Sequence, residues 1–187
     1  MFTKNEIRDL IVSIIALTFI FSSFNIGIFI STLFVVIIAF ASHEILGHKL
    51  LAQHYGCEAE YKMWPLGLFL GLVTALIPGG FTIAAPGAVY ISPYKKGFAF
   101  KVSSLTRKQY ALISLAGPLV NIVLAISLLT LNFFFPLGLL ITASKISFFL
   151  AFFNLLPIPP MDGSKIMTWN LKLWLLITAV AFAGLFI

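Results

Sequence analysis

Two histidines and a glutamate lie close together in an otherwise apolar stretch, in the segment HEILGH at residues 43–48. Ionisable residues inside a long apolar segment are costly and usually have a function. Neutral imidazole is a common zinc ligand, and a neighbouring carboxylate can accept a proton during hydrolysis. His43 and His48 are therefore candidate metal ligands, and Glu44 is the candidate general base.

The spacing of these two histidines is unusual, because they are five positions apart rather than four. At about 100° per residue, a residue four positions on lies roughly 40° away, whereas one five positions on lies roughly 140° away. Three alternatives follow. A π-bulge could absorb one residue. Glu44 and His48 could be the ligands, with His43 displaced. Or the site is not assembled, and the chain is an inactive relative that binds membrane helices or metal without cleavage.

A second polar cluster lies near the C-terminus, in the segment NLLPIPPMDG at residues 154–163. Its prolines interrupt a helix, so we expect the chain to turn and bring Asp162 back towards the other helices. Catalytic zinc sites combine three protein ligands with one open position, and Asp162 is the natural third ligand. Asn154 can hydrogen-bond a substrate backbone.

The composition is that of an integral membrane protein. The 187 residues are 60% hydrophobic and only 10% charged, and the mean hydropathy is +1.07. The net charge of +6 does not indicate a nucleic-acid partner, because basic residues between apolar segments more often record membrane topology. The single Cys57 excludes both an intramolecular disulfide and a cysteine zinc cluster.

We expect an α-helical polytopic membrane protein, a single domain over residues 1–187, with about five to six transmembrane helices. The first helix occupies residues 1–25 and the last occupies residues 171–187. The segment 64–77 is short for a span, and the β-rich stretch after it precedes the next long helix. Together they predict a re-entrant, membrane-associated element. The apolar segments are 7–24, 26–55, 64–77, 110–135, 137–156 and 171–187.

Charge predicts the orientation. Residues 95–108 contain five basic residues and no acid, so the positive-inside rule places this loop in the cytoplasm. Lys4 and Arg8 favour a cytoplasmic N-terminus. The two polar clusters then reach the same depth, near the cytoplasmic ends of their helices, in what we expect to be a prokaryotic cell membrane.

With these motifs in order, the chain resembles the site-2 protease family of intramembrane zinc metalloproteases. HEILGH matches the family's H-E-x-x-H element apart from one extra residue. NLLPIPPMDG matches N-x-x-P-x-x-x-L-D-G, with Met161 in place of Leu. SLAGPLVNIVLA, at residues 114–125, is similar to the helix that precedes that element. The resemblance covers about residues 30–165.

This resemblance implies one Zn²⁺ per chain, held by His43, His48 and Asp162. It implies Glu44 as general base and acid, and Asn154 as a residue that holds the substrate.

It also implies two partners, the lipid bilayer and a transmembrane segment of another protein, which is the substrate. An extended substrate could pair with a strand edge in residues 81–103.

Overall fold

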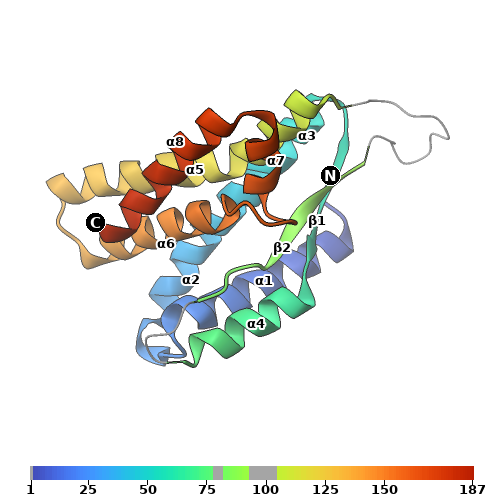
Figure 1. Ribbon diagram of the computed structural model, residues 1–187. Helices are drawn as coiled ribbons and strands as arrows, with labels where there is room; N and C mark the ends of the chain where they lie inside the picture. The colour runs from blue at the N-terminus through green and yellow to red at the C-terminus, as the bar shows by residue number, and fades with distance from the viewer. Residues whose placement is uncertain (1, 78–81, 93–104) are drawn as a thin grey trace.

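The computed structural model describes residues 2–77, 82–92 and 105–187, and most of these are helical (Figure 1). The elements are α1 (Lys4–Ser22), α2 (Ile26–Ala41), the π-helix η1 (Ser42–Lys49), α3 (Leu50–His54), β1 (Glu58–Met63), α4 (Pro65–Ala75), β2 (Gly87–Ser92), α5 (Arg107–Phe134), α6 (Gly138–Asn154), α7 (Asp162–Trp169), α8 (Leu171–Ala183) and the 3₁₀-helix η2 (Gly184–Phe186).

Among the described residues, two helices are long and apolar enough to cross a membrane. One is the continuous helix Ile26–His54, formed by α2, η1 and α3, and the other is α5. The remaining apolar helices are shorter, at Pro65–Ala75, Gly138–Asn154 and Leu171–Phe186. The expected count of five to six spans therefore stays a prediction, and two candidate spans are what length and composition support.

Helix α6 contacts α2, α5 and α8, and α1 contacts α2 and α4. Figure 1 shows α5, α6 and α8 on one side of the molecule, with α1 and α4 on the other side. The start of α5 is fixed by a capping box, in which the Thr106 hydroxyl accepts from the Gln109 backbone and the Gln109 side chain accepts from the Thr106 backbone.

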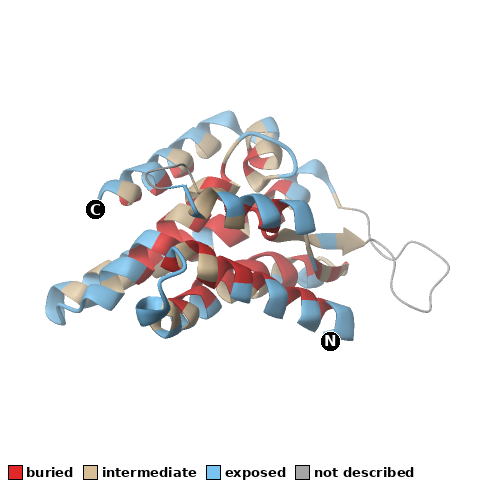
Figure 2. Ribbon diagram, turned by 90° about the horizontal axis from the view of Figure 1, so that it is seen from below, coloured by how far each residue is buried: buried red, intermediate tan, exposed pale blue. Residues whose placement is uncertain are grey.

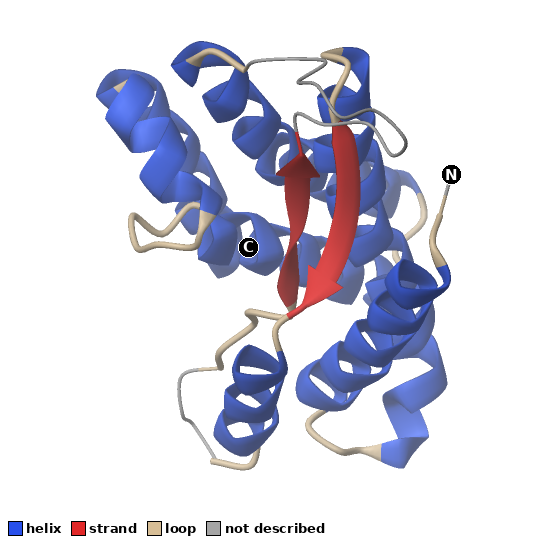
Figure 3. Cartoon of the chain, turned by 90° about the vertical axis from the view of Figure 1, so that its right-hand side faces the viewer, coloured by secondary structure: helices blue, strands red, loops and turns tan. Residues whose placement is uncertain are grey.

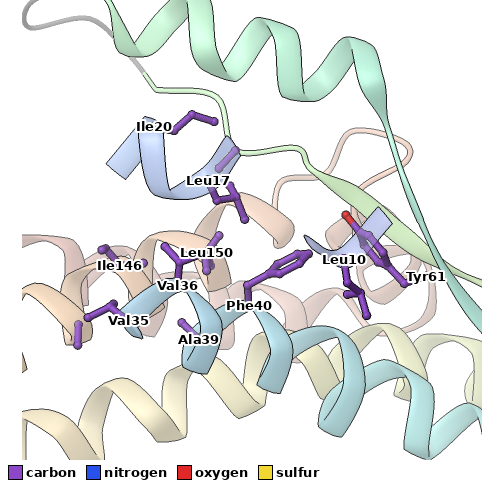
Figure 4. Close-up of a cluster of buried hydrophobic side chains, with 12 residues drawn as sticks. Leu10, Leu17, Ile20, Val35, Val36, Ala39, Phe40, Tyr61, Ile146 and Leu150 are labelled. Atoms are coloured by element: carbon purple, nitrogen blue, oxygen red, sulfur yellow. The ribbon is translucent and has the colours of Figure 1, made fainter. Parts of the chain in front are cut away.

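A core of buried apolar side chains joins α1, α2, α6 and β1 (Figure 4). Leu17, Val36 and Phe40 are at most 2% exposed, and so are Leu150 and Tyr61. Burying one such side chain stabilises the fold by about 1.5–3 kcal/mol. Figure 2 shows the buried residues on the facing sides of the helices, whereas the outer surface carries large apolar side chains such as those of Ile26, Phe34 and Phe133.

The two strands form one antiparallel sheet, in which Glu58 pairs with Ser92 and Met63 pairs with Gly87 (Figure 3). The chain therefore leaves the sheet at Met63, runs through α4 and returns beside its point of departure. The sequence analysis expected strands after α4 and missed β1, although charged and less polar residues alternate along EAEYKM. The other residues of that expected region, 78–81 and 93–104, lie outside the described part of the chain.

Polar side chains of α1 hold β1 in place. Glu6 accepts from Lys49 Nζ at 2.5 and 2.6 Å and from the Tyr61 backbone N–H at 3.1 Å. Asp9 accepts from the Met63 backbone N–H, and the Ser13 and Tyr61 hydroxyls lie 2.8 Å apart. Burial raises the pKa of the Tyr61 phenol, which therefore stays protonated. These contacts fix the sheet beside the helix that carries the histidines.

Candidate metal centre

The segment HEILGH lies inside a π-helix, the first of the three alternatives that its spacing allows. Residues Ser42–Lys49 are in π-helical conformation, and the Leu50 backbone N–H donates to the Ile45 carbonyl five residues back. Bonds of this i→i+5 type return the fifth residue to the face of the first. His43 Nε2 and His48 Nε2 consequently lie 3.1 Å apart.

Two glycines let α5 pack directly against this π-helix. A Cβ atom at Gly47 would lie 2.5 Å from the Cα of Gly117. A Cβ atom at Gly117 would lie 2.3 Å from His48 Nε2 and 2.7 Å from His43 Nε2. Any side chain at Gly117 would therefore occupy the space of the imidazoles, so α5 forms one wall of the site.

The Pro-rich turn after α6 brings Asp162 to the histidines. Asp162 is the first residue of α7, and its Oδ2 lies 3.1 Å from His48 Nε2. Its other oxygen, Oδ1, accepts from Lys165 Nζ at 3.1 Å. The turn packs tightly against the end of α6, since a Cβ atom at Gly163 would lie 2.0 Å from the Leu155 carbonyl oxygen.

The ligand atoms of His43, His48 and Asp162 all lie within 4.8 Å of one another, and this group could hold a metal ion. Two ligands each about 2.1 Å from a tetrahedral zinc lie roughly 3.4 Å apart, so the two 3.1 Å separations, one between the histidines and one from His48 to Asp162, fit such a site. Two imidazoles and a carboxylate are also a donor set that suits zinc.

The remaining ring nitrogen of each histidine has a polar partner on α5. His48 Nδ1 lies 2.8 Å from the Ile113 carbonyl, and His43 Nδ1 lies 3.0 Å from Asn121 Nδ2. Metal-binding histidines almost always bond through their second nitrogen. The hydrogen bond between Asn121 and His43 therefore joins α5 to the π-helix.

Glu44 and Asn154 line the same cavity as His48, Asp162 and Lys165. Glu44 is 3% exposed, and its Oε2 has no hydrogen-bond partner among the described residues. Asn154, at the end of α6, donates through Nδ2 to the Leu150 carbonyl. The structure thus gathers all five residues that the sequence singles out.

The sequence analysis missed Lys165, whose position three residues after Asp162 on α7 was an available signal. Strand β2 supplies Gly87, Ala88, Val89 and Ile91 to the cavity wall, and it lies within the β-rich stretch in which the sequence analysis expected a strand edge for the substrate. The part of α5 that contacts the histidines falls in SLAGPLVNIVLA at residues 114–125, which the sequence analysis singled out as a motif without giving Gly117 or Asn121 a role at the metal.

No family model matches the chain, and no solved structure matches it. Two curated proteins of Methanocaldococcus jannaschii do. The chain is 41% identical over 183 residues to "Putative zinc metalloprotease MJ0611", which covers 94% of this chain and 90% of that protein. It is 30% identical over 152 residues to "Zinc metalloprotease MJ0392", which covers 78% of this chain and 36% of that longer protein.

The chain belongs to this family of zinc metalloproteases. The archaeal relatives agree with the expected prokaryotic origin. The family membership agrees with the geometry of the site. The side chains that could hold a metal ion among the described residues, those of His43, His48 and Asp162, come from the two polar clusters selected from the sequence. His43 and Asp162 are 119 positions apart in the sequence of this zinc metalloprotease, and folding brings them together.

Proposed function

We propose that this metalloprotease is an intramembrane zinc endopeptidase of the site-2 type, which cleaves transmembrane segments of other membrane proteins. One observation carries the proposal. The π-helix places His43 and His48 3.1 Å apart, opposite Asp162, within a helix that is apolar enough to cross a membrane.

The depth of the histidines supports cleavage inside the bilayer. At 1.5 Å per residue, His48 and His43 lie about 9 Å and about 17 Å from the His54 end of their helix. The hydrocarbon core of a bilayer is about 30 Å thick. If Ile26–His54 spans it, the site lies within the apolar layer, towards the end that the basic residues 95–108 place in the cytoplasm.

The chain's own residues have distinct roles in this reaction. His43, His48 and Asp162 hold one zinc ion, which when bound lowers the pKa of a coordinated water towards neutrality. Glu44 Oε2, which has no partner among the described residues, is free to take a proton from the attacking water. The same carboxylate then hands that proton to the nitrogen of the leaving segment. Asn154 lies in the cavity wall and bonds the substrate backbone.

Strand β2 supports an extended conformation for the substrate. One edge of β2 pairs with β1, and residues along β2 line the cavity beside Glu44 and His48. No strand covers the other edge in the part of the chain that the structure describes. A substrate segment added there would form backbone hydrogen bonds that position its scissile peptide.

The test is a cleavage assay in liposomes that contain the purified protein and a library of tagged single-span peptides. Library members differ in helix-breaking residues near their cytoplasmic ends. We expect the wild type to cleave some members, to lose activity with a chelator and to regain it with added zinc. Glu44→Gln should cleave them about 10²–10⁴-fold more slowly, because its amide cannot accept the proton.

Zinc content gives the control. Glu44→Gln should retain about one zinc per chain, whereas Asp162→Ala should lose more affinity than the roughly 10–100-fold that outer partners of a metal site contribute. Glu58→Gln, the same change on β1, should cleave as the wild type does. Zinc binding without cleavage of any library member would refute the endopeptidase and favour a relative that binds without cutting. Undiminished cleavage by Glu44→Gln would refute the assigned general base.

A further inference from the structure

A buried carboxamide on α5 contacts the first histidine of the metal centre. Asn121 is fully buried, and its amide nitrogen lies 3.0 Å from His43 Nδ1. The Oδ1 of the same amide has no partner among the described residues. Burying an amide that is only half satisfied is costly, so this residue needs a reason beyond packing.

The protonation of His43 decides how this amide must point. An imidazole that binds a metal is neutral and presents a lone pair at the nitrogen that faces the ion. Since His43 Nε2 faces His48, Nε2 must be the free nitrogen and Nδ1 must carry the hydrogen. An N–H donor at Nδ1 requires an acceptor, which Asn121 supplies only through Oδ1.

The orientation of an amide is assigned from its hydrogen bonds, because its nitrogen and oxygen have nearly the same shape. Rotating the Asn121 amide by half a turn places Oδ1 next to His43 Nδ1. In the present orientation Oδ1 has no partner among the described residues, so rotating the amide breaks no hydrogen bond made by Oδ1, and the requirement of His43 decides between the two orientations.

His48 provides an independent comparison within the same site. Its Nδ1 lies 2.8 Å from the Ile113 carbonyl oxygen, which can only accept. Ile113, Gly117 and Asn121 are spaced four residues apart on α5, and they therefore lie on one face of that helix. One face of α5 thus presents an acceptor to His48, a glycine to the Nε2 atoms and, at the next turn, Asn121 to His43.

We infer that Asn121 is a positioning residue for the metal centre, whose Oδ1 accepts a hydrogen bond from His43 Nδ1–H and holds the Nε2 lone pair towards the ion. This inference rests on the proposed zinc site. The two histidines are then held in different ways. His48 Nδ1 bonds to a backbone carbonyl, which no substitution removes. His43 is held by a side chain, so its position can be tested by mutation.

The test compares zinc dissociation constants, measured by competition with a chromophoric chelator in detergent. Asn121→Leu keeps the size of the side chain and removes the acceptor. We expect it to bind zinc about 10–100-fold more weakly than the wild type. Asn121→Asp keeps an acceptor at the same place, and should bind at least tenfold more tightly than Asn121→Leu. Asn132→Leu, the same change near the C-terminal end of α5, should leave the dissociation constant within about twofold, as expected for a site remote from the metal.

A second measurement needs no variant. In zinc-loaded wild type labelled with ¹⁵N-histidine, the nitrogen chemical shifts of His43 should show Nδ1 protonated and Nε2 bound. Equal zinc affinity in Asn121→Leu, no recovery in Asn121→Asp, or a protonated Nε2 on His43 would each overturn the inference and leave the zinc site standing. A wild type that binds no zinc would instead overturn the proposed site itself, and the inference with it.

Discussion

Adding a single methyl group at Gly117 should disable the metal centre while leaving the fold intact. The Cβ atom of Gly117→Ala would lie 2.3 Å from His48 Nε2 and 2.7 Å from His43 Nε2, whereas ordinary van der Waals contacts begin at 3.4 Å. The nearer imidazole must therefore move away by about 1.1 Å, or α5 must withdraw by a similar distance. Ligand distances in metal sites vary by only about 0.2 Å.

The size of the effect follows from that displacement. We take the loss of an outer partner of a metal site, which lowers metal affinity about 10–100-fold, as the scale for displacing a ligand by about 1 Å. In free energy this is about 1.4–2.8 kcal/mol. The helix itself should not weaken, because alanine is more favourable than glycine in a helix interior by about 1 kcal/mol.

Zinc competition titration and circular dichroism separate these two effects. We expect Gly117→Ala to keep the helix content of the wild type and to bind zinc at least about tenfold more weakly. Gly138→Ala is the matched control, since a Cβ atom there meets nothing within 4 Å, and its zinc affinity should be unchanged. Wild-type affinity in Gly117→Ala would show that α5 does not form the wall of the site.

A deletion between the histidines and a substitution on α1 provide two further tests. Deleting Leu46, which is 56% exposed, restores a four-residue spacing, and zinc titration should show affinity within about tenfold of the wild type because an α-helix then aligns the ligands. Loss of zinc binding would mean that the π-helix itself is required. Glu6→Gln leaves Lys49 buried without its counterion, and thermal unfolding should show a loss of about 3–5 kcal/mol. Adding Lys49→Met to Glu6→Gln should recover most of the lost free energy of unfolding. No recovery would refute the ion-pair explanation.

The candidate ligands could be selected from the sequence because their signals are local. Histidine and glutamate stand out in an apolar segment whatever the local helix geometry. The prolines before Asp162 predict the turn that brings this residue back to the histidines. The π-helix was one of three alternatives, because the spacing alone does not say whether the helix deforms or the site fails. Contacts with α1 and α5 decide that question, and both are far away in the sequence.

The contribution of α5 could be predicted only in part. The motif SLAGPLVNIVLA marks residues 114–125 of this helix, but the motif alone does not say which of its side chains face the histidines, because that depends on the rotation of α5 about its axis. That rotation decides whether Gly117 and Asn121 meet the histidines or point elsewhere. Strand β1 was missed because six residues with three charged side chains read as a connection, and its partner β2 lies beyond α4.

The extra residue in HEILGH is absorbed locally because both ends of the segment are anchored. Upstream, Val36 and Phe40 are buried in the core between α1, α2 and α6. Downstream, Lys49 is 3% exposed and paired with Glu6. Rotating either end by the roughly 100° that one residue represents would expose that core or break that ion pair. Widening one turn costs less, and since His43 and His48 bracket the widened turn, the distortion restores their common face.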